Sequence, residues 1–103
     1  MDFREVLNQI MQKLDDAYGL FLMGYDGIAI EKSLRSCSLN LDMLAAEYTN
    51  FLRVIDNSLA SNNAGNLDEL INVTDNVVIL LKLITNEYFL FMVMNKDANF
   101  GRA

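Results

Sequence analysis

The sequence predicts an α+β fold, in which helices pack on a five-stranded antiparallel sheet in the order α-β-β-α-β-β-β. Three observations lead to this prediction. Apolar residues recur at helical spacing over residues 2–16 and 39–61. Apolar runs of strand length, joined by short polar turns, occur at 20–24, 28–33, 77–84 and 87–94. The chain has no proline and no low-complexity linker, so we expect residues 1–103 to form a single domain.

The first predicted helix, residues 2–16, has one apolar face. Its members are Phe3, Val6, Leu7, Ile10 and Leu14, which follow the i, i+3, i+4, i+7 pattern of a helix that packs on one side. Tyr18-Gly19 follows and is expected to end the helix.

The first two predicted strands flank Asp26-Gly27. Asp-Gly is a preferred pair for a two-residue type I′ turn, because both central residues then need positive φ. The pair therefore predicts a β-hairpin. Asp26 could instead be a catalytic carboxylate, but aspartate in such a pair usually serves the backbone, so we interpret it as a turn residue.

The second predicted helix, residues 39–61, carries two stripes and has Ser38 or Asn40 as its N-cap. The face expected to pack on the sheet consists of Leu41, Leu44, Ala45, Tyr48, Leu52, Ile55 and Leu59. An adjacent, mixed stripe consists of Met43, Glu47, Asn50 and Val54, with Phe51 between the two. This second stripe is either a partner surface or a solvated flank with two exposed apolar residues, and both interpretations remain open.

The C-terminal part of the chain predicts three further strands. Leu67, Glu69, Ile71 and Val73 alternate, which indicates a strand with one buried face. The runs 77–84 and 87–94 are almost continuously apolar, which predicts strands covered on both faces; their β-branched and aromatic content argues against buried helices. The closing segment "NKDANFGRA" predicts the start of a third helix, capped by Asp97 or Asn99 and truncated at the end of the chain.

Composition and charge exclude several classes of function. The net charge is −6, with 14 acidic and 8 basic residues and no basic cluster, so we expect no nucleic-acid partner. The only cysteine, Cys37, cannot form an internal disulfide. No secretory signal is recognisable, and no apolar run approaches the roughly 20 residues of a membrane span. We therefore expect a cytoplasmic protein without membrane insertion.

The sequence contains few of the residues and motifs that catalytic sites use. The absence of histidine removes the commonest general base and the commonest metal ligand. One cysteine cannot supply a zinc site, and neither G-x-x-x-x-G-K-[ST] nor G-x-G-x-x-G occurs. The sequence thus predicts no catalytic residue, no metal and no cofactor, and we expect that the protein is not an enzyme.

An arginine could still act in trans on the nucleotide of a partner protein. The four candidates are Arg4, Arg35, Arg53 and Arg102. Nothing in the local sequence distinguishes one of them, so we expect solvated surface arginines.

The segments "FLMGYDGIAIEKS" and "FLFMVMNKDANFGRA", with the long helix between them, resemble the roadblock family. This family includes roadblock-type dynein light chains and the bacterial mutual-gliding-motility protein B, a regulator of a Ras-like GTPase. The resemblance covers essentially the whole chain. The sequence departs from the family after "NFGRA", where family members usually continue into a full C-terminal helix, and this leaves the partner assignments open.

The resemblance implies a homodimer, or a heterodimer of like domains, in which the second helices pack together and the third strands pair across a two-fold axis. The dimer or partner interface would then contain Met43, Glu47, Asn50, Phe51, Val54, Leu67, Glu69, Ile71 and Val73. It also implies a regulator or binding platform of a small Ras-like GTPase; the alternative is a non-catalytic dimeric adaptor in a motor or signalling assembly. A small-molecule sensor or enzyme is a third hypothesis, whose polar candidates are Tyr18, Tyr48 and Tyr88.

Overall fold

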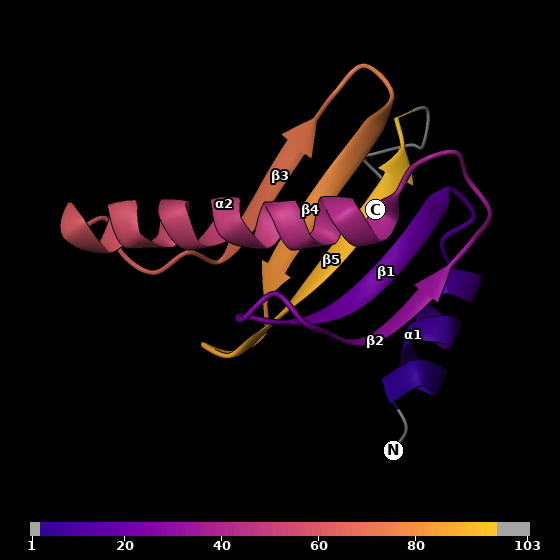
Figure 1. Cartoon of the computed structure of the whole chain (residues 1–103), viewed down its shortest axis with the longest axis horizontal. Coiled ribbons are helices and arrows are strands. Elements are labelled where there is room, and N and C mark those ends of the chain that lie inside the picture. Colours follow the sequence, from indigo (N-terminus) through magenta and orange to yellow (C-terminus); the bar gives the residue numbers. More distant parts are fainter. Residues whose placement is uncertain (1–2, 97–103) are drawn as a thin grey trace.

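A computed structural model describes residues 3–96 as two helices and one five-stranded sheet (Figure 1). The elements are α1 (Phe3–Gln12), β1 (Ala17–Gly24), β2 (Ala29–Leu34), α2 (Leu41–Ser61), β3 (Glu69–Val73), β4 (Val77–Leu83) and β5 (Tyr88–Asn95). All neighbouring strands are antiparallel, in the spatial order β2-β1-β5-β4-β3. The predicted α+β fold is confirmed, and the predicted third helix lies outside the described residues.

The centre of the sheet is formed by β1 and β5. Phe21 lies directly opposite Phe91 in the ladder, and their rings meet edge to face with centroids 5.6 Å apart. On this face α2 covers the sheet with Leu41, Ala45 and Leu52, which are all buried. Removal of these apolar side chains from water supplies the main stabilisation of the fold.

The opposite face of the sheet is only partly covered. Helix α1 lies over β1 and β2, with Leu7 and Met11 buried against Leu20 and Leu22. Beyond α1 a hollow of about 190 Å³ opens over the other strands, with Leu80, Leu90 and Met92 half-buried in its lining. The prediction that β4 and β5 are covered on both faces is therefore wrong over this part of the sheet.

Helix α1 ends at Gln12, earlier than predicted. The backbone N–H groups of Lys13 and Leu14 bond to carbonyls three residues back, which tightens the last turn. The Arg35 guanidinium donates to the carbonyl oxygens of Met11, Leu14, Asp15 and Ala17, the last at 2.6 Å. These carbonyls end or follow the helix, where the α-helical bonding pattern stops, so Arg35 caps α1 from the far end of β2.

Tyr18-Gly19 does not end a helix, because both residues lie inside β1. A Cβ atom on Gly19 would lie 2.8 Å from Leu41 Cδ1 and 2.9 Å from Leu34 Cδ2, so this glycine permits close packing of β1 against its neighbours. The predicted apolar face of α1 also needs one correction, since Phe3 is exposed and Met11 is buried instead.

The hairpin at Asp26-Gly27 is confirmed, but its predicted turn type is wrong. Gly27 has φ +90°, whereas Asp26 does not have positive φ. The Gly27 N–H donates to Gly24 O at 3.0 Å and the Gly24 N–H donates to Ile28 O at 2.8 Å, which makes a three-residue loop. The Ile28 N–H donates to Asp26 Oδ1 at 3.1 Å, as expected for an aspartate that serves the turn.

Two side-chain hydrogen bonds fix α2. Asn40 is the N-cap, and its Oδ1 accepts from the Met43 N–H at 3.0 Å. The Tyr25 hydroxyl donates to Asp56 Oδ2 at 2.7 Å and ties the β1–β2 turn to α2. Burial and this hydrogen bond to a carboxylate raise the pKa of Tyr25 to about 12.

We expect Arg35→Ala to lower the free energy of unfolding by about 2 kcal/mol, because several carbonyls lose a charged donor. Arg35→Lys should retain part of this stability, since a lysine keeps the charge but lacks the planar fork. Lys13→Ala, an equal charge loss at an exposed position beside the same helix end, should cost less than about 0.5 kcal/mol. Urea unfolding measures all three, and equal losses for Arg35→Ala and Lys13→Ala would contradict the capping role.

The Tyr25–Asp56 contact predicts a pH dependence. Between pH 10 and 12 the unfolded chain releases the phenolic proton that the folded chain retains, so this tyrosine makes stability fall as pH rises through that window. Tyr25→Phe should be about 1 kcal/mol less stable below pH 10, through the lost hydrogen bond. Above pH 10, the difference in the free energy of unfolding between the wild type and Tyr25→Phe should become smaller. Unfolding curves with an unchanged gap at every pH would refute this assignment.

Candidate functional site

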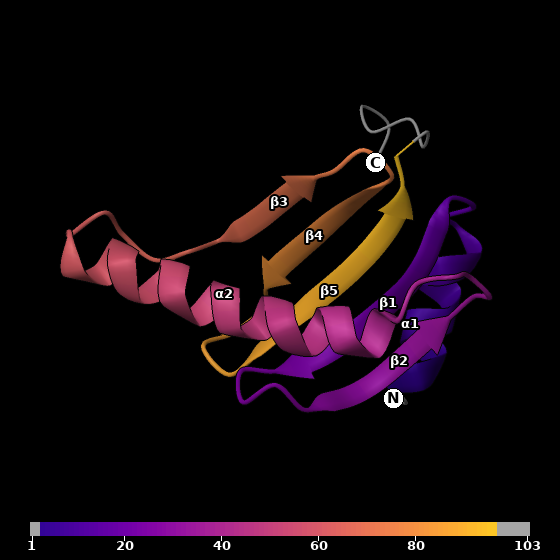
Figure 2. The same ribbon diagram turned by 45° about the horizontal axis from the view of Figure 1, so that its top comes forward.

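Helix α2 is longer than the sheet beneath it is wide. Its 21 residues span about 31 Å, whereas five strands span about 19 Å between the outer strand axes. The C-terminal half of α2 therefore projects past β3, as Figures 1 and 2 both show. The buried residues of α2 are Leu41, Ala45, Thr49 and Leu52, and beyond Leu52 the helix has only half-buried and exposed residues.

Met43, Glu47, Asn50 and Val54, here called the α2 stripe, lie on the side of α2 that faces away from the sheet. All four are exposed, and Val54 is 67% exposed. The predicted sheet-facing residues are buried or half-buried, so the division of the helix into two stripes is confirmed. Phe51 is also exposed and lies toward β3, since its ring packs on Tyr48, whose hydroxyl accepts a hydrogen bond from Asn72 of β3.

Strand β3 is one of the two edges of the sheet. Leu70 and Asn72 are half-buried on the side of α2, whereas Glu69, Ile71 and Val73 are exposed on the opposite face. The alternation from Leu67 to Val73 predicted that one face of this strand is buried, but Ile71 and Val73 on that face point out of the core.

Leu67 differs from the other predicted interface residues. It precedes β3 and packs, partly buried, against the core beneath α2. The structure thus places the nine predicted residues in three positions: the outer surface of α2 with Phe51, the far face of the β3 edge, and the core beside it.

The two edge strands differ in the features that discourage pairing with another chain. On β2, Glu31 pairs with Arg4 at 3.3 Å, Lys32 pairs with Asp42 at 2.6 Å, and the ladder to β1 contains a bulge. Strand β3 pairs with β4 in an unbroken register. Its nearest charged pair is Lys82–Asp68 at 2.9 Å, a hydrogen bond that raises the pKa of Lys82. Because charges and bulges discourage edge pairing, β3 is the edge better suited to pair with another chain.

The three described arginines are engaged within the chain. Arg35 caps α1, Arg4 contacts Glu31, and Arg53 donates to Asn50 Oδ1 at 2.7 Å. Arg102 lies outside the described residues. Within residues 3–96, each arginine therefore contacts another group of the same chain.

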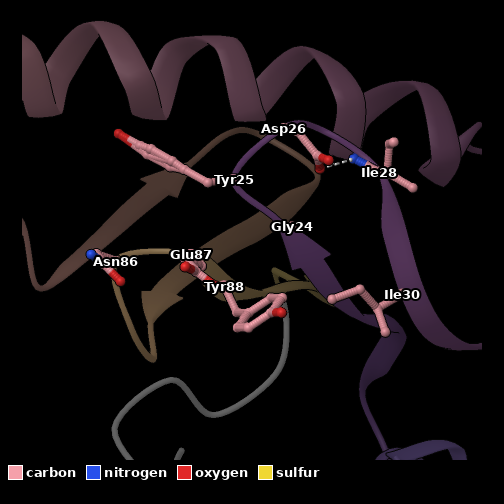
Figure 3. A pocket seen from close by; sticks show the side chains of 8 residues that line it. All are labelled: Gly24, Tyr25, Asp26, Ile28, Ile30, Asn86, Glu87 and Tyr88. Atoms are coloured by element: carbon pink, nitrogen blue, oxygen red, sulfur yellow. Dashed lines mark hydrogen bonds between the residues drawn. The ribbon is translucent and has the colours of Figure 1, made fainter.

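A second hollow, of about 440 Å³, opens between the β1–β2 and β4–β5 turns (Figure 3). Its lining includes Ile28, Ile30 and Tyr88, all exposed, and the acidic residues Asp26 and Glu87. Sequence reasoning missed this pocket. Two isoleucines beside a turn were the only available signal, because the pocket also needs a turn that follows much later in the chain.

Between residues 3 and 96 no group of three or more Cys, Asp or Glu side chains is arranged to hold a metal ion. Neither α1 nor α2 is both long and apolar enough to cross a membrane.

Comparison with known proteins identifies similar structures. Neither the protein-family models nor the curated proteins give a match. Among solved structures, a Roadblock/LC7 domain from Streptomyces avermitilis superimposes with a TM-score of 0.80 at 11% identity, over 94% of this chain and 81% of that chain. MglB from Myxococcus xanthus gives a TM-score of 0.82 at 10% identity, over 95% of this chain and 79% of that chain.

MglC from Myxococcus xanthus is more similar in sequence, at 28% identity over 99% of this chain and 87% of that chain, with a TM-score of 0.64. These proteins share the five-stranded antiparallel sheet and flanking helices described above. The chain has the Roadblock/LC7 fold.

Proposed function

We propose that the protein is one roadblock-like domain that acts in the cytoplasm as a non-enzymatic homodimer and binds a small Ras-like GTPase, whose GTP hydrolysis it regulates. The observation that carries this proposal is the β3 edge, which pairs without a bulge and lies next to the half of α2 that projects past it. Within residues 3–96, the outer side of β3 pairs with no strand, and the apolar side chains of Met43, Val54, Ile71 and Val73 are exposed.

A second copy of the chain would satisfy both features. Antiparallel pairing of β3 with its counterpart across a two-fold axis would continue the sheet from one protomer into the other. The continued sheet would lie beneath the projecting end of α2. The two β3 strands would bring Ile71 and Val73 of each protomer together, and the α2 helices would approach through Phe51 and the α2 stripe.

The GTPase part of the proposal rests on the likeness to MglB and on the composition of the α2 stripe. Met43 and Val54 flank the polar Glu47 and Asn50, a mixture typical of surfaces that bind other proteins. Because Arg4, Arg35 and Arg53 are each bonded within the chain, we infer that any stimulation inserts none of these three arginines and instead rearranges the catalytic residues of the GTPase itself.

The engaged arginines also favour a second candidate, a dimeric adaptor that tethers larger proteins without affecting hydrolysis. The same dimer would serve both functions. The two candidates differ in one property only, which is the rate of GTP turnover by a bound partner.

The double substitution Met43→Glu with Val54→Glu should convert the dimer into a monomer, because carboxylates buried without partners at the interface are costly. Size exclusion with light scattering measures the mass. Ile28→Glu is a matched control, since Ile28 is 66% exposed, as Val54 is 67% exposed, but lies beside the opposite edge of the sheet. A monomeric wild type, or a dimeric double variant, would rule out this interface.

Hydrolysis assays with each small Ras-like GTPase of the same genome test the regulatory function. We expect the wild type to bind one of them and to accelerate its single-turnover hydrolysis, and the double variant to lose this effect. Binding without acceleration would establish the adaptor. Absence of both binding and acceleration would contradict the proposed partner class.

A further inference from the structure

The pocket between the two turns has a preformed shape. The Tyr25 N–H donates to Glu87 O at 2.8 Å, which joins the β1–β2 turn to the β4–β5 turn. The Tyr25 side chain points away from the pocket toward α2, where it bonds to Asp56 (Figure 3). The Thr85 hydroxyl accepts from the N–H groups of Glu87 and Tyr88 at 3.0 and 3.2 Å. These bonds hold both turns in place, so little conformational entropy would be lost there when a ligand binds.

The wall of the pocket is apolar and aromatic. Gly24 lies directly opposite Tyr88 in the ladder, so no side chain of β1 covers the ring at that position. Ile30 lies on the same side of the pocket as the Tyr88 ring (Figure 3). A Cβ on Gly24 would lie 2.6 Å from Asp26 Oδ1, so an alanine there would disturb the turn as well as narrow the pocket.

The rim of the pocket is acidic. Asp26 and Glu87 line it together with Asn86, and among residues 3–96 no lysine or arginine does. The three ion pairs found among residues 3–96 use Glu31, Asp42 and Asp68, so neither rim carboxylate belongs to one of them. The protein is acidic overall, and its net charge of −6 favours the approach of a cationic partner.

We propose that this pocket binds an arginine side chain presented by a partner protein. The planar guanidinium would stack on the Tyr88 ring, its aliphatic stem would pack on Ile30, and its N–H donors would reach the carboxylates of Asp26 and Glu87. Arginine fits these three features better than lysine, because its fork can serve two carboxylates while its flat face lies on an aromatic ring. This binding site is separate from the β3 edge and the α2 stripe, and it does not depend on dimerisation.

The test is a titration of the full chain with the end-blocked pentapeptide Gly-Val-Arg-Val-Gly, followed by backbone amide NMR signals. The matched peptides carry citrulline, which has the same shape without the charge, or lysine at the central position. We expect the arginine peptide to shift the amide signals of Gly24, Ile28 and Tyr88, and to bind more tightly than either matched peptide. Binding should weaken as salt is added.

Protein variants locate the charge that matters. Asp26→Asn keeps the oxygen that accepts from the Ile28 N–H, and Glu87→Gln keeps the side-chain length, so both remove charge with little change in shape. Each should weaken binding roughly two- to fivefold, the range expected for exposed charge pairs. Asp75→Asn, an equal charge loss in the β3–β4 turn at the opposite end of the sheet, should leave binding unchanged.

Three results would overturn the proposal. One is equal binding of the citrulline and arginine peptides, which would make the pocket merely apolar. Another is an equal loss of binding in Asp75→Asn and Glu87→Gln, which would assign the effect to net charge. The third is the absence of signal shifts at the pocket, or shifts confined to α2 and β3.

Discussion

The pairing of β1 with β5 is the contact on which the rest of the structure depends. It joins the first strand to the last in the middle of the sheet and brings Phe21 against Phe91 in the core. Since β2 follows β1 and β3 precedes β4 through hairpins, the central pair makes β2 and β3 the two edges. The same pair places the β1–β2 turn beside the β4–β5 turn, where the acidic pocket opens. Both candidate binding surfaces are thus consequences of one long-range contact.

The two edge strands and α2 form the surfaces at which pairing with another chain is proposed. Charged pairs and a bulge guard β2, whereas β3 has an unbroken register and exposed β-branched side chains. A helix of 21 residues cannot bury one whole side on five strands, so its C-terminal half extends over the less guarded edge. This geometry supports the proposed association between copies of the chain, and the pocket between the β1–β2 and β4–β5 turns lies apart from the β3 edge.

Local patterns in the sequence predicted most of the fold. Helical spacing located both helices, and the apolar runs located the strands, because burial on one side forces a periodic choice of residues. The errors occurred where a distant residue decides the local structure. Helix α1 ends where Arg35 reaches its carbonyls, and Gly19 lies in a strand, where it pairs with Leu34 of β2 and Val93 of β5. The turn at Asp26 is not of type I′, and its residue Tyr25 is bonded to two distant residues, Glu87 and Asp56. For the candidate site, the periodicity of α2 separated its two stripes, but the exposed face of β3 and the pocket depend on register across the sheet.

Amide hydrogen exchange at the two sheet edges tests the central claim most directly, since β2 serves as an internal control within the same molecule. A dimer that pairs through β3 hydrogen-bonds the outward N–H groups of Glu69–Val73, while the outward N–H groups of β2 stay open to water. We expect the amides of β3 to be protected at high protein concentration and to lose this protection on dilution, with no change in β2. Equal and concentration-independent exchange at both edges would contradict a dimer built on β3.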